Sequence, residues 1–381
     1  MATQHVLITL FFISALSYFG CSKKPSHEEK NVTNPIEKTA FGHTADGRPI
    51  DQFTLTNSQG MRVKIINFGG IITALETPDR KGLMGDVVLG FDSLQDYLVK
   101  QTHFGPIIGR YSGFIAKGKI SIDGQEYQLE TNAGPNHLHG GQDGFDAVLW
   151  DPEIVSLESG RQALQLSFVS PDGMGRFPGT LSTTITYTLS DNNELGIEYK
   201  ATTDKKTYVN LTQHCYFNLS GGKASNVLNH EVTLFANQYA VVDETMIPTG
   251  ELKDVKGTPA DFTTPRAIGA NIDQLPNGYD HNFPVKGSDP ANPTLVGRVY
   301  EPLSGRVMEL FTSRTGFEFA SANWLNGSAI GKGGVHYTKQ YGFLLYPQSL
   351  PDSPNHPDFP STLLKPGETY HEITVYKFSA E

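Results

Sequence analysis

The sequence predicts an all-β protein, organised as one large antiparallel β-sandwich. Its composition supports this class, since 39 Gly and 23 Pro among 381 residues, with only 18% charged residues, are typical of a turn-rich strand protein. Short runs of alternating apolar and polar residues recur between Gly, Asn and Asp turns along most of the chain. No long amphipathic helix and no solenoid repeat follow the N-terminal segment.

The N-terminal segment has the pattern of a lipoprotein signal peptide. Residues 1–20 contain no Asp, Glu, Lys or Arg, and the apolar run 6–19 is too short to cross a bilayer. We interpret 1–20 as a signal peptide that is cleaved before Cys21, whose sulfur then carries the lipid. The alternatives are an ordinary secretory signal and a membrane-anchoring helix with an incidental cysteine. This interpretation predicts an exported protein, lipid-anchored in the cell envelope at the periplasm or the outer membrane.

The remainder of the chain is expected to form a tether and one domain. Residues 22–35 are polar, charged and free of aromatic residues, which predicts a flexible tether over 21–38. No linker-like segment divides the residues beyond this tether, so we expect 39–381 to be a single domain. With Cys21 lipidated, Cys215 is the only other cysteine, and no intrachain disulfide is expected.

Two stretches carry the clearest strand patterns. Residues 53–56 and 61–65 flank the turn 57–60 (N-S-Q-G) and predict a β-hairpin. Residues 180–189 alternate strictly, and a turn at 191–193 leads into another period-two run. One face of 180–189 carries Leu181, Ile185, Tyr187 and Leu189, and the other carries Ser182, Thr184, Thr186 and Thr188.

Charge and motifs exclude several classes of function. A formal net charge of −10 disfavours binding to a phosphate backbone, so nucleic acid is not an expected partner. Neither a P-loop nor a glycine-rich dinucleotide motif occurs, and a G-x-S-x-G nucleophile elbow is also missing from the sequence. We therefore expect neither a nucleotide cofactor nor an α/β-hydrolase mechanism.

Four polar clusters are the candidates for chemistry. They are 134–141 (GPNHLHGG), 213–214 (QH), 278–282 (GYDHN) and 346–355 (YPQSLPDSPN). The second belongs to 210–221, an aromatic-rich stretch that predicts a strand with His214 at its centre and a turn at 220–222. Each cluster also has a structural alternative: solvated histidines in a glycine-rich turn, a core histidine at 214, or an ordinary turn carboxylate at Asp280.

The histidines of these clusters raise the question of a metal site. His137 and His139 are two residues apart, so both point to one face of an extended chain, and His214 could complete a three-histidine zinc site. Neither an H-E-x-x-H motif nor a cysteine pair accompanies them. We therefore expect no metal.

The clusters stand in order with further landmarks, namely Gly109-Arg110-Tyr111, Gly144-Phe145-Asp146, Asp243-Glu244-Thr245 and 364–370 (LKPGETY). Together these motifs closely resemble those of the aldose 1-epimerases, or galactose mutarotases, from about residue 53 to residue 378. The resemblance implies the galactose mutarotase-like supersandwich with a sugar cleft on its concave face. It also implies cofactor-free interconversion of the α and β anomers of a hexose, so the expected partner is a monosaccharide or an oligosaccharide.

The resemblance also implies roles for individual residues. Ring opening needs one proton delivered to the ring oxygen while another leaves the anomeric hydroxyl, and a histidine with a pKa of about 6.5 is suited to this task. By similarity His214 is the general acid, His139 holds the region of the ring oxygen, and Asp280 binds sugar hydroxyls.

Four positions in three segments depart from the family pattern. Tyr346 stands where the family has its general base, a Glu in an L-E-x-Q segment, and Gly113-Phe114 replaces an Asn-Arg pair. Glu318 stands where the family has a binding glutamine. A tyrosine acting as base at pH 7 needs its pKa of about 10 lowered by about three units, or roughly 4 kcal/mol.

We therefore assign Phe114, Tyr346 and Gln348 to sugar binding and hypothesise that Glu318 replaces the missing base. The alternative for Glu318 is an exposed strand glutamate without a role. Three functions stay open: a mutarotase, a non-catalytic carbohydrate-binding lipoprotein, or an enzyme that acts on a modified sugar.

Overall fold

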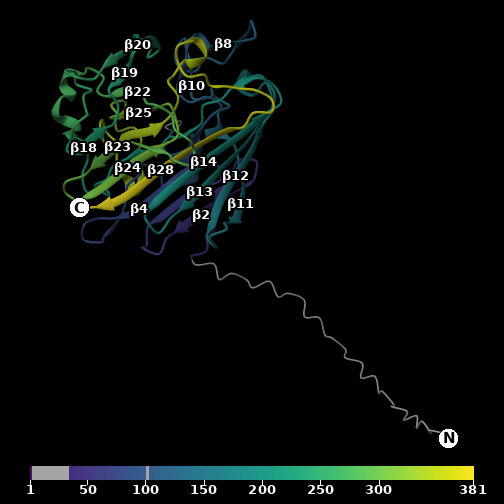
Figure 1. The fold of residues 1–381 in the computed structure, drawn as a ribbon. Coiled ribbons are helices and arrows are strands. Elements are labelled where there is room, and N and C mark those ends of the chain that lie inside the picture. Colours follow the sequence, from purple (N-terminus) through teal and green to yellow (C-terminus); the bar gives the residue numbers. More distant parts are fainter. Residues whose placement is uncertain (2–33, 100–102) are drawn as a thin grey trace. The chain divides into compact units, whose positions relative to one another are not determined.

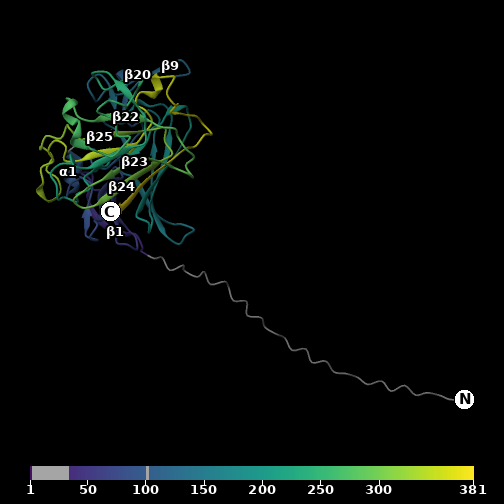
Figure 2. The ribbon, with the colours of Figure 1, turned by 60° about the vertical axis from the view of Figure 1, so that its left-hand side comes forward.

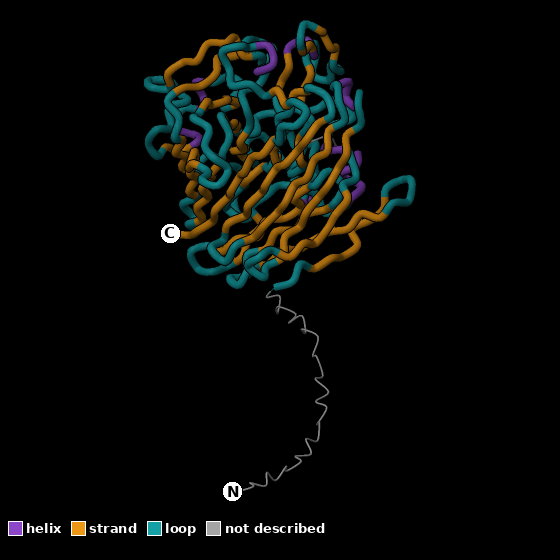
Figure 3. The backbone as a smooth tube through the Cα atoms, turned by 45° about the vertical axis from the view of Figure 1, so that its right-hand side comes forward, coloured by secondary structure: helices purple, strands orange, loops and turns teal. Residues whose placement is uncertain are grey.

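Nine antiparallel strands form the largest sheet of the computed structural model, which describes residues 1, 34–99 and 103–381. Figure 1 and Figure 3 show these strands running side by side. In spatial order they are β11 (Asp151–Ser156), β12 (Gln162–Ser170), β13 (Leu181–Leu189), β14 (Glu194–Thr203), β28 (Tyr370–Ala380), β24 (Arg306–Thr312), β23 (Thr294–Tyr300), β18 (Glu231–Leu234) and β21 (Arg266–Ala267). The predicted antiparallel all-β class is confirmed.

Strand β13 shows why the alternating pattern folds this way. Leu181, Ile185, Tyr187 and Leu189 are buried together with Thr183 on the same face, while Ser182, Thr184, Thr186 and Thr188 are partly or fully exposed. The strand pairs with β12 on one side and with β14 on the other. Successive side chains of a strand point to opposite faces, so this alternation places one face of the sheet against the core.

A five-stranded sheet contains the predicted N-terminal hairpin. Its strands are β1 (Glu37–His43), β2 (Pro49–Thr56), β3 (Arg62–Ile66), β4 (Ile71–Pro78) and β5 (Met84–Asp86). The hairpin prediction is confirmed by the pairing of β2 with β3 around the 57–60 turn. Strand β1 begins at Glu37, so the last residues of the predicted tether already belong to this sheet.

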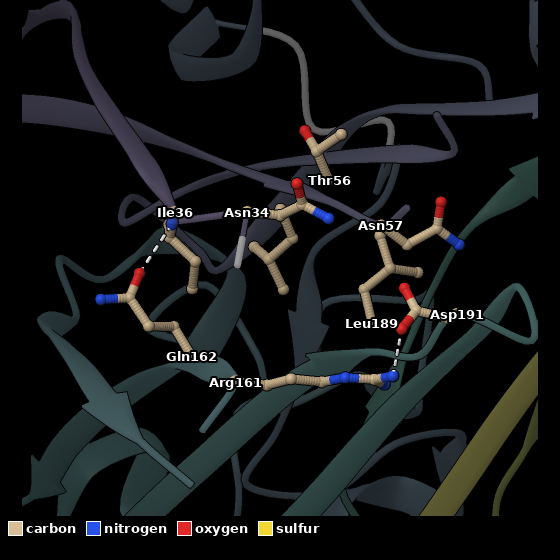
Figure 4. A pocket seen from close by; sticks show the side chains of 9 residues that line it. Asn34, Ile36, Thr56, Asn57, Arg161, Gln162, Leu189 and Asp191 are labelled. Carbon is tan, nitrogen blue, oxygen red and sulfur yellow. Dashed lines mark hydrogen bonds and ion pairs between the residues drawn. The ribbon is translucent and has the colours of Figure 1, made fainter. Parts of the chain in front are cut away.

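The start of the domain is fixed by contacts beside β1. The backbone N–H of Ile36 donates to Gln162 Oε1 at 2.7 Å, and Arg161 forms an ion pair with Asp191 (Figure 4). The small hollow between these residues contains none of the histidines or carboxylates assigned to sugar chemistry. The predicted signal peptide, Cys21 and most of the tether lie outside the described residues.

A four-stranded sheet carries the residues of the candidate site. It consists of β17 (Tyr216–Phe217), β26 (Phe343–Pro347), β25 (Gly316–Ala320) and β22 (Asp280–Pro284). Five two-stranded ladders complete the strands: β6 (Ile107–Ile108) with β16 (Thr212–Gln213), β7 (Phe114–Ile115) with β10 (His137–Leu138), β8 (Lys119–Ile122) with β9 (Gln125–Gln128), β15 (Thr207–Tyr208) with β27 (Leu363–Leu364), and β19 (Gln238–Val242) with β20 (Pro248–Asp254).

Helices are few and short in the part of the chain that the structure describes. The α-helix α1 (Leu94–Val99) is visible in Figure 2, and the remaining helices are 3₁₀ turns. These turns are Ala116–Gly118, Phe145–Ala147, Met174–Arg176, Ile268–Ala270, Ile272–Gln274, Lys332–Gly334 and Ser353–Asn355. Within the same residues, no helix has the length and apolar character needed to cross a bilayer.

The main core joins all three large sheets. One continuous cluster of buried side chains includes Phe53 of β2, Ile185 of β13, Phe319 of β25 and Leu345 of β26. One face of the four-stranded sheet therefore packs against the core, and its polar side chains lie on the other face.

The predicted strand over 210–221 is divided into two short strands. β16 pairs with β6, whereas β17 pairs with β26, and His214 lies between the two. The backbone N–H of His214 donates to the carbonyl of Pro106 at 2.9 Å, and its carbonyl accepts from the N–H of Gly105 at 2.9 Å. The alternating pattern predicted the strand character correctly but could not show that the partner strand changes at His214.

Candidate active site

A cavity of about 260 Å³ brings together five of the residues that the sequence assigned to sugar chemistry. These are His139, His214, Asp280, Glu318 and Phe114, and the other lining residues are His103, Gly113, Leu138, Tyr216, Met246, Asn282 and Trp324. Asp280 and Glu318 come from the adjacent strands β22 and β25, which lie side by side in Figure 1 and Figure 2. Residues more than a hundred positions apart in the chain thus share one site.

His214 is held by a backbone carbonyl. Its Nδ1 lies 3.0 Å from the carbonyl oxygen of His103, so Nδ1 carries the hydrogen and Nε2 is the remaining lone-pair nitrogen. The residue is 4% exposed. Burial, followed by the charge of His103, lowers the pKa of His214 to about 3. The imidazole is therefore neutral at pH 7, with Nε2 available as a proton acceptor.

His139 has the opposite tautomer. The backbone N–H of Gly113 donates to His139 Nδ1 at 3.1 Å, so the hydrogen of the neutral ring is on Nε2. Burial and the neighbouring histidines lower the pKa of His139 well below its ordinary value. His139 can thus donate a hydrogen bond to a sugar oxygen while remaining uncharged, 5.0 Å from the His214 ring between centroids.

The expectation that His137 and His139 share a face is wrong. Strand β10 ends at Leu138, and His139 adopts a left-handed φ of 56°, which breaks the alternation of an extended chain. His137 turns into a separate cluster, where its Nδ1 meets the carbonyl of Glu130 at 2.8 Å and its ring packs on Phe177. His137 and His139 therefore do not lie together, as the hypothesis of a three-histidine zinc site requires.

His103 is a site residue that the sequence did not single out. It lines the cavity, and its ring lies 5.3 Å from His139 and 5.8 Å from His214 between centroids. Its Nε2 is 3.4 Å from Asp146 Oδ2. A lone histidine in the segment T-H-F-G-P gives no pattern from which this position could be inferred.

Glu318 is oriented by a buried chain of hydrogen bonds. Gln348 Nε2 donates to Glu318 Oε2 at 2.8 Å and to Asn282 Oδ1 at 2.6 Å, while Gln348 Oε1 accepts from Ser112 Oγ at 2.6 Å. Gln348 is fully buried and does not line the cavity. Its assignment to sugar contact is therefore corrected: its amide is fully engaged within the protein, and it positions Glu318.

Asp280 and Glu318 form a pair of carboxyl groups. Burial raises the pKa of Asp280 to about 6. Burial, with the charge of Asp280 added to it, raises the pKa of Glu318 well above its ordinary value. Two neighbouring carboxyl groups in a buried site do not both ionise readily, so ionisation of one opposes ionisation of the other.

Tyr346 packs beside the site residues His214 and Glu318. It is fully buried, its ring lies 4.7 Å from the His214 ring between centroids, and it is the direct cross-strand partner of Glu318. Burial and the charge of Glu318 raise the pKa of Tyr346 well above its ordinary value, which argues against a role as base. Its hydroxyl lies beside the Glu318 carboxyl. Because Tyr346 is fully buried and does not line the cavity, the predicted contact with sugar is corrected.

Most of the other lining side chains are aromatic or aliphatic, and Asn282 adds a polar one. Phe114, Leu138 and Met246 are partly buried, Tyr216 is buried, and Trp324 is exposed. Phe114 and Leu138 are cross-strand partners on β7 and β10. Of these residues the sequence had identified only Phe114, because the others reach the cavity from separate loops and strands.

The sequence of this chain is similar to those of aldose 1-epimerases and galactose mutarotases. A family model described as aldose 1-epimerase matches residues 51–377. The chain is 45% identical to galactose mutarotase of Homo sapiens over 346 residues, which cover 90% of this chain and 98% of that protein. It is 36% identical to aldose 1-epimerase of Escherichia coli strain K12 over 343 residues, covering 88% and 97%.

Solved structures agree with this grouping. Galactose 1-epimerase from Lactobacillus acidophilus matches with a TM-score of 0.78 at 25% identity, covering 91% of this chain and 99% of that one. An aldose epimerase homologue from C. elegans matches with a TM-score of 0.79 at 28% identity, covering 86% and 98%. The predicted supersandwich is confirmed.

Proposed function

Since the chain belongs to the aldose 1-epimerase family, we propose that it interconverts the α and β anomers of an aldohexose with His214 and Glu318 as its acid/base pair. The family assignment supports an isomerase that acts on hexose anomers. The identity of the base is the new element, because the family's glutamate position is occupied by Tyr346.

One structural observation carries this proposal. Glu318 and Tyr346 are directly opposite each other in the β25–β26 ladder. Directly opposed residues have Cβ atoms about 4.5–5.5 Å apart and point to the same face of a sheet. A carboxylate moved from the position of Tyr346 to that of Glu318 therefore stays on the same face of the sheet, and Glu318 lines the cavity together with His139 and His214.

The His214–Glu318 pair can supply both proton transfers. In this mechanism the pair holds one exchangeable proton, which rests on Glu318 while His214 is neutral. Moving that proton to His214 gives the charged pair, in which His214 protonates the ring oxygen and Glu318 accepts the proton of the anomeric hydroxyl. The C1–O5 bond breaks and the aldehyde forms. After the aldehyde group rotates, both transfers reverse and the ring closes on its other face.

The neighbouring groups hold the sugar during these steps. His139 donates from Nε2 to a ring or hydroxyl oxygen, and Asp280 accepts from sugar hydroxyls. A buried cavity strengthens these electrostatic interactions, since little water competes for the same groups.

The direct test is the rate of anomer exchange, measured by NMR exchange spectroscopy on glucose, galactose and xylose. Glu318→Gln is expected to lower the rate by about 10²- to 10⁴-fold, the usual loss when a general base is removed. Glu309→Gln serves as the control, because it makes the same substitution on β24, outside the cavity. An unchanged rate in Glu318→Gln removes Glu318 from this role, and no acceleration by the wild type overturns the proposed reaction.

A second candidate is a carbohydrate-binding protein without turnover. The observation that favours it is the replacement of a charged clamp by Gly113 and Phe114 in a cavity with an apolar rim. Saturable sugar binding without anomer exchange would select this function. Exchange gained by a Phe114→Arg, Tyr346→Glu double variant would then show that the scaffold is intact and that only the site has diverged. An enzyme acting on a modified sugar would use the same His214 and Glu318 on a different substrate.

We also propose that the protein is exported and tethered to the cell envelope through lipid on Cys21. The support is the sequence of residues 1–25: an apolar run, a small residue before the cysteine and a polar segment after it. Metabolic labelling with a fatty acid followed by fractionation tests this proposal. Cys21→Ser should lose the label and leave the membrane fraction, whereas an unlabelled wild-type protein would contradict the anchor.

A further inference from the structure

His103 completes a triangle of histidine rings in the cavity. Its ring centroid lies 5.3 Å from that of His139 and 5.8 Å from that of His214, and these last two are 5.0 Å apart. All three histidines line the cavity that also contains the Glu318 carboxyl. The reaction proposed above uses His139 and His214, which leaves His103 without a function.

A metal ion does not account for this triangle. The backbone N–H of Gly113 donates to His139 Nδ1, so the hydrogen of the neutral ring is on Nε2, which then has no lone pair for a metal. Among the residues that the structure describes, no three histidine, cysteine, aspartate or glutamate side chains are arranged to hold a metal ion. The role of His103 therefore lies in the imidazole itself.

His103 differs from the other two histidines in its partner. Its Nε2 lies 3.4 Å from Asp146 Oδ2, whereas the bonded nitrogens of His139 and His214 meet backbone groups. Asp146 belongs to the 3₁₀ turn Phe145–Ala147, which is held in place because the N–H of Phe145 donates to the carbonyl of Gly109 at 2.9 Å. Asp146 thus supplies a fixed counter-charge for a protonated His103.

A protonated His103 would give the cavity a cation. The described lining contains the carboxyl groups of Asp280 and Glu318 but no Lys or Arg. Both nitrogens of a protonated imidazole carry a hydrogen. Since Nε2–H of His103 faces Asp146, Nδ1–H is the donor that is left for an oxygen of a bound sugar.

The backbone of His103 fixes its ring beside the reacting atoms. Its φ of 51° is in the left-handed region, which is uncommon for residues other than glycine and often occurs at functional sites. Its carbonyl oxygen accepts the hydrogen bond from His214 Nδ1 at 3.0 Å. One residue therefore sets the tautomer of His214 with its main chain and lines the cavity with its side chain.

We propose that His103 is a further catalytic histidine, which donates a hydrogen bond from Nδ1 to the ring oxygen O5 of the sugar as the C1–O5 bond breaks. The electron pair of that bond moves to O5, which takes its proton from His214, while Glu318 accepts the proton of the anomeric hydroxyl. His103 transfers no proton and stabilises the negative charge that develops on O5. This inference rests on the proposed mutarotase function and adds a residue to its mechanism.

The same cation would assist His214. Burial, followed by the charge of His103, lowers the pKa of His214 to about 3. A protonated His214 beside His103 is therefore a strong acid, and it releases its proton readily to O5.

The first test is the kinetics of His103→Asn. Asparagine adopts the left-handed backbone readily, so the carbonyl that holds His214 is kept. We expect kcat for anomer exchange of glucose and galactose to fall about 10²- to 10³-fold, the usual cost of one donor to a developing anion, with KM changed less than about threefold. A raised KM with an unchanged kcat would overturn the catalytic role.

A matched control is His371→Asn. It removes an imidazole whose Nε2 lies 2.8 Å from Glu198 Oε1, outside the cavity, so both kinetic constants should stay at their wild-type values. Asp146→Asn keeps His103 but removes its counter-charge, and it should lower kcat less than His103→Asn does.

Chemical rescue separates catalysis from structure. Glycine suits the left-handed backbone, and His103→Gly leaves space for a free imidazole. Added imidazole should restore part of kcat in His103→Gly and saturate, after subtraction of the rate that the same imidazole gives without protein. The wild type and His371→Asn should not respond. A rate in His103→Gly that stays low at every imidazole concentration would indicate a purely structural role.

A spectroscopic readout distinguishes this inference from the mutarotase function. In protein labelled with ¹⁵N-histidine, the His103 signals are those missing from His103→Asn, and galactose should shift the Nδ1 signal. If the wild type accelerates exchange and His103→Asn keeps its kcat, the role of His103 is refuted and the mutarotase function stands. If the wild type gives no acceleration, the mutarotase function fails; a shifted Nδ1 signal then still supports contact between His103 and the sugar, and an unshifted one refutes it.

Discussion

Gln348→Met is the most informative single change at this site. Methionine has a similar volume, but it cannot make the three hydrogen bonds of Gln348 to Ser112, Asn282 and Glu318. The fully buried position excludes water as a substitute partner. The variant therefore removes support from Glu318 without opening a large cavity.

The magnitude follows from the charge of the partners. The bonds to Ser112 and Asn282 are neutral, and their loss should lower the free energy of unfolding by about 2–4 kcal/mol, including the desolvation cost of the polar atoms left behind. A hydrogen bond contributes about 1.5–3 kcal/mol when its partner is charged and about 0.5–1.5 kcal/mol when it is neutral, so ionisation of Glu318 strengthens this bond by about 1–1.5 kcal/mol, or about one pKa unit. Removing it raises the pKa of Glu318 further, because the carboxylate loses a donor.

The assay is the pH profile of kcat/KM for anomer exchange, alongside denaturant unfolding. The active pair holds one proton, so activity falls on the alkaline side as Glu318 loses that proton. This limb of the profile should move to higher pH by about one unit in Gln348→Met. Ser112→Ala is the matched control, because it costs stability but leaves the bond to Glu318 in place. A stability loss with an unmoved alkaline limb would refute the role of Gln348 in setting the pKa of Glu318.

Three further predictions concern stability. In Gly140→Ala the added Cβ would meet a backbone carbonyl oxygen, at a position where φ is 93°. In the control Gly134→Ala, φ is 59° but the added Cβ meets nothing within 4 Å. Gly140→Ala should therefore lower the melting temperature much more than Gly134→Ala, and equal melting temperatures would contradict the clash. Ile185→Ala should cost about 2–5 kcal/mol in denaturant unfolding, whereas Thr184→Ala on the opposite face should stay within about 0.5 kcal/mol. Burial lowers the pKa of His230 to about 4 in the folded protein, whereas the same histidine in the unfolded chain takes up a proton below about pH 6.5. The free energy of unfolding should therefore fall as the pH drops from about 6.5 to about 4. His230→Gln should reduce this slope by up to about 1.4 kcal/mol per pH unit.

Much of the fold could be predicted because strand periodicity is a local property. The alternation in 180–189 identified the buried face of β13, and the turn at 57–60 identified the β2–β3 hairpin. The prediction of one continuous strand over 210–221 was wrong, because pairing with other strands is not a local property. A sequence pattern reports the face of each residue, but it does not report where one partner strand is replaced by another.

Much of the candidate site was also accessible from the sequence. His139, His214, Asp280, Glu318 and Phe114 share one cavity, as the resemblance to the aldose 1-epimerases implied. Residues outside recognisable motifs were missed, because nothing in their local sequence distinguishes them from ordinary loop or core residues. They include His103, Met246 and Trp324.

The sequence by itself determined the antiparallel class, the family and the absence of a glutamate at position 346. Only the tertiary structure decided what replaces that glutamate, since Glu318 and Tyr346 become neighbours through the pairing of β25 with β26. It also showed that the left-handed backbone at His139 directs His137 and His139 to different places, and that Gln348 bonds to Glu318 within the protein. The reason is physical: side-chain alternation depends on neighbouring residues, whereas burial, tautomer and pKa depend on groups that the fold brings together from distant parts of the chain.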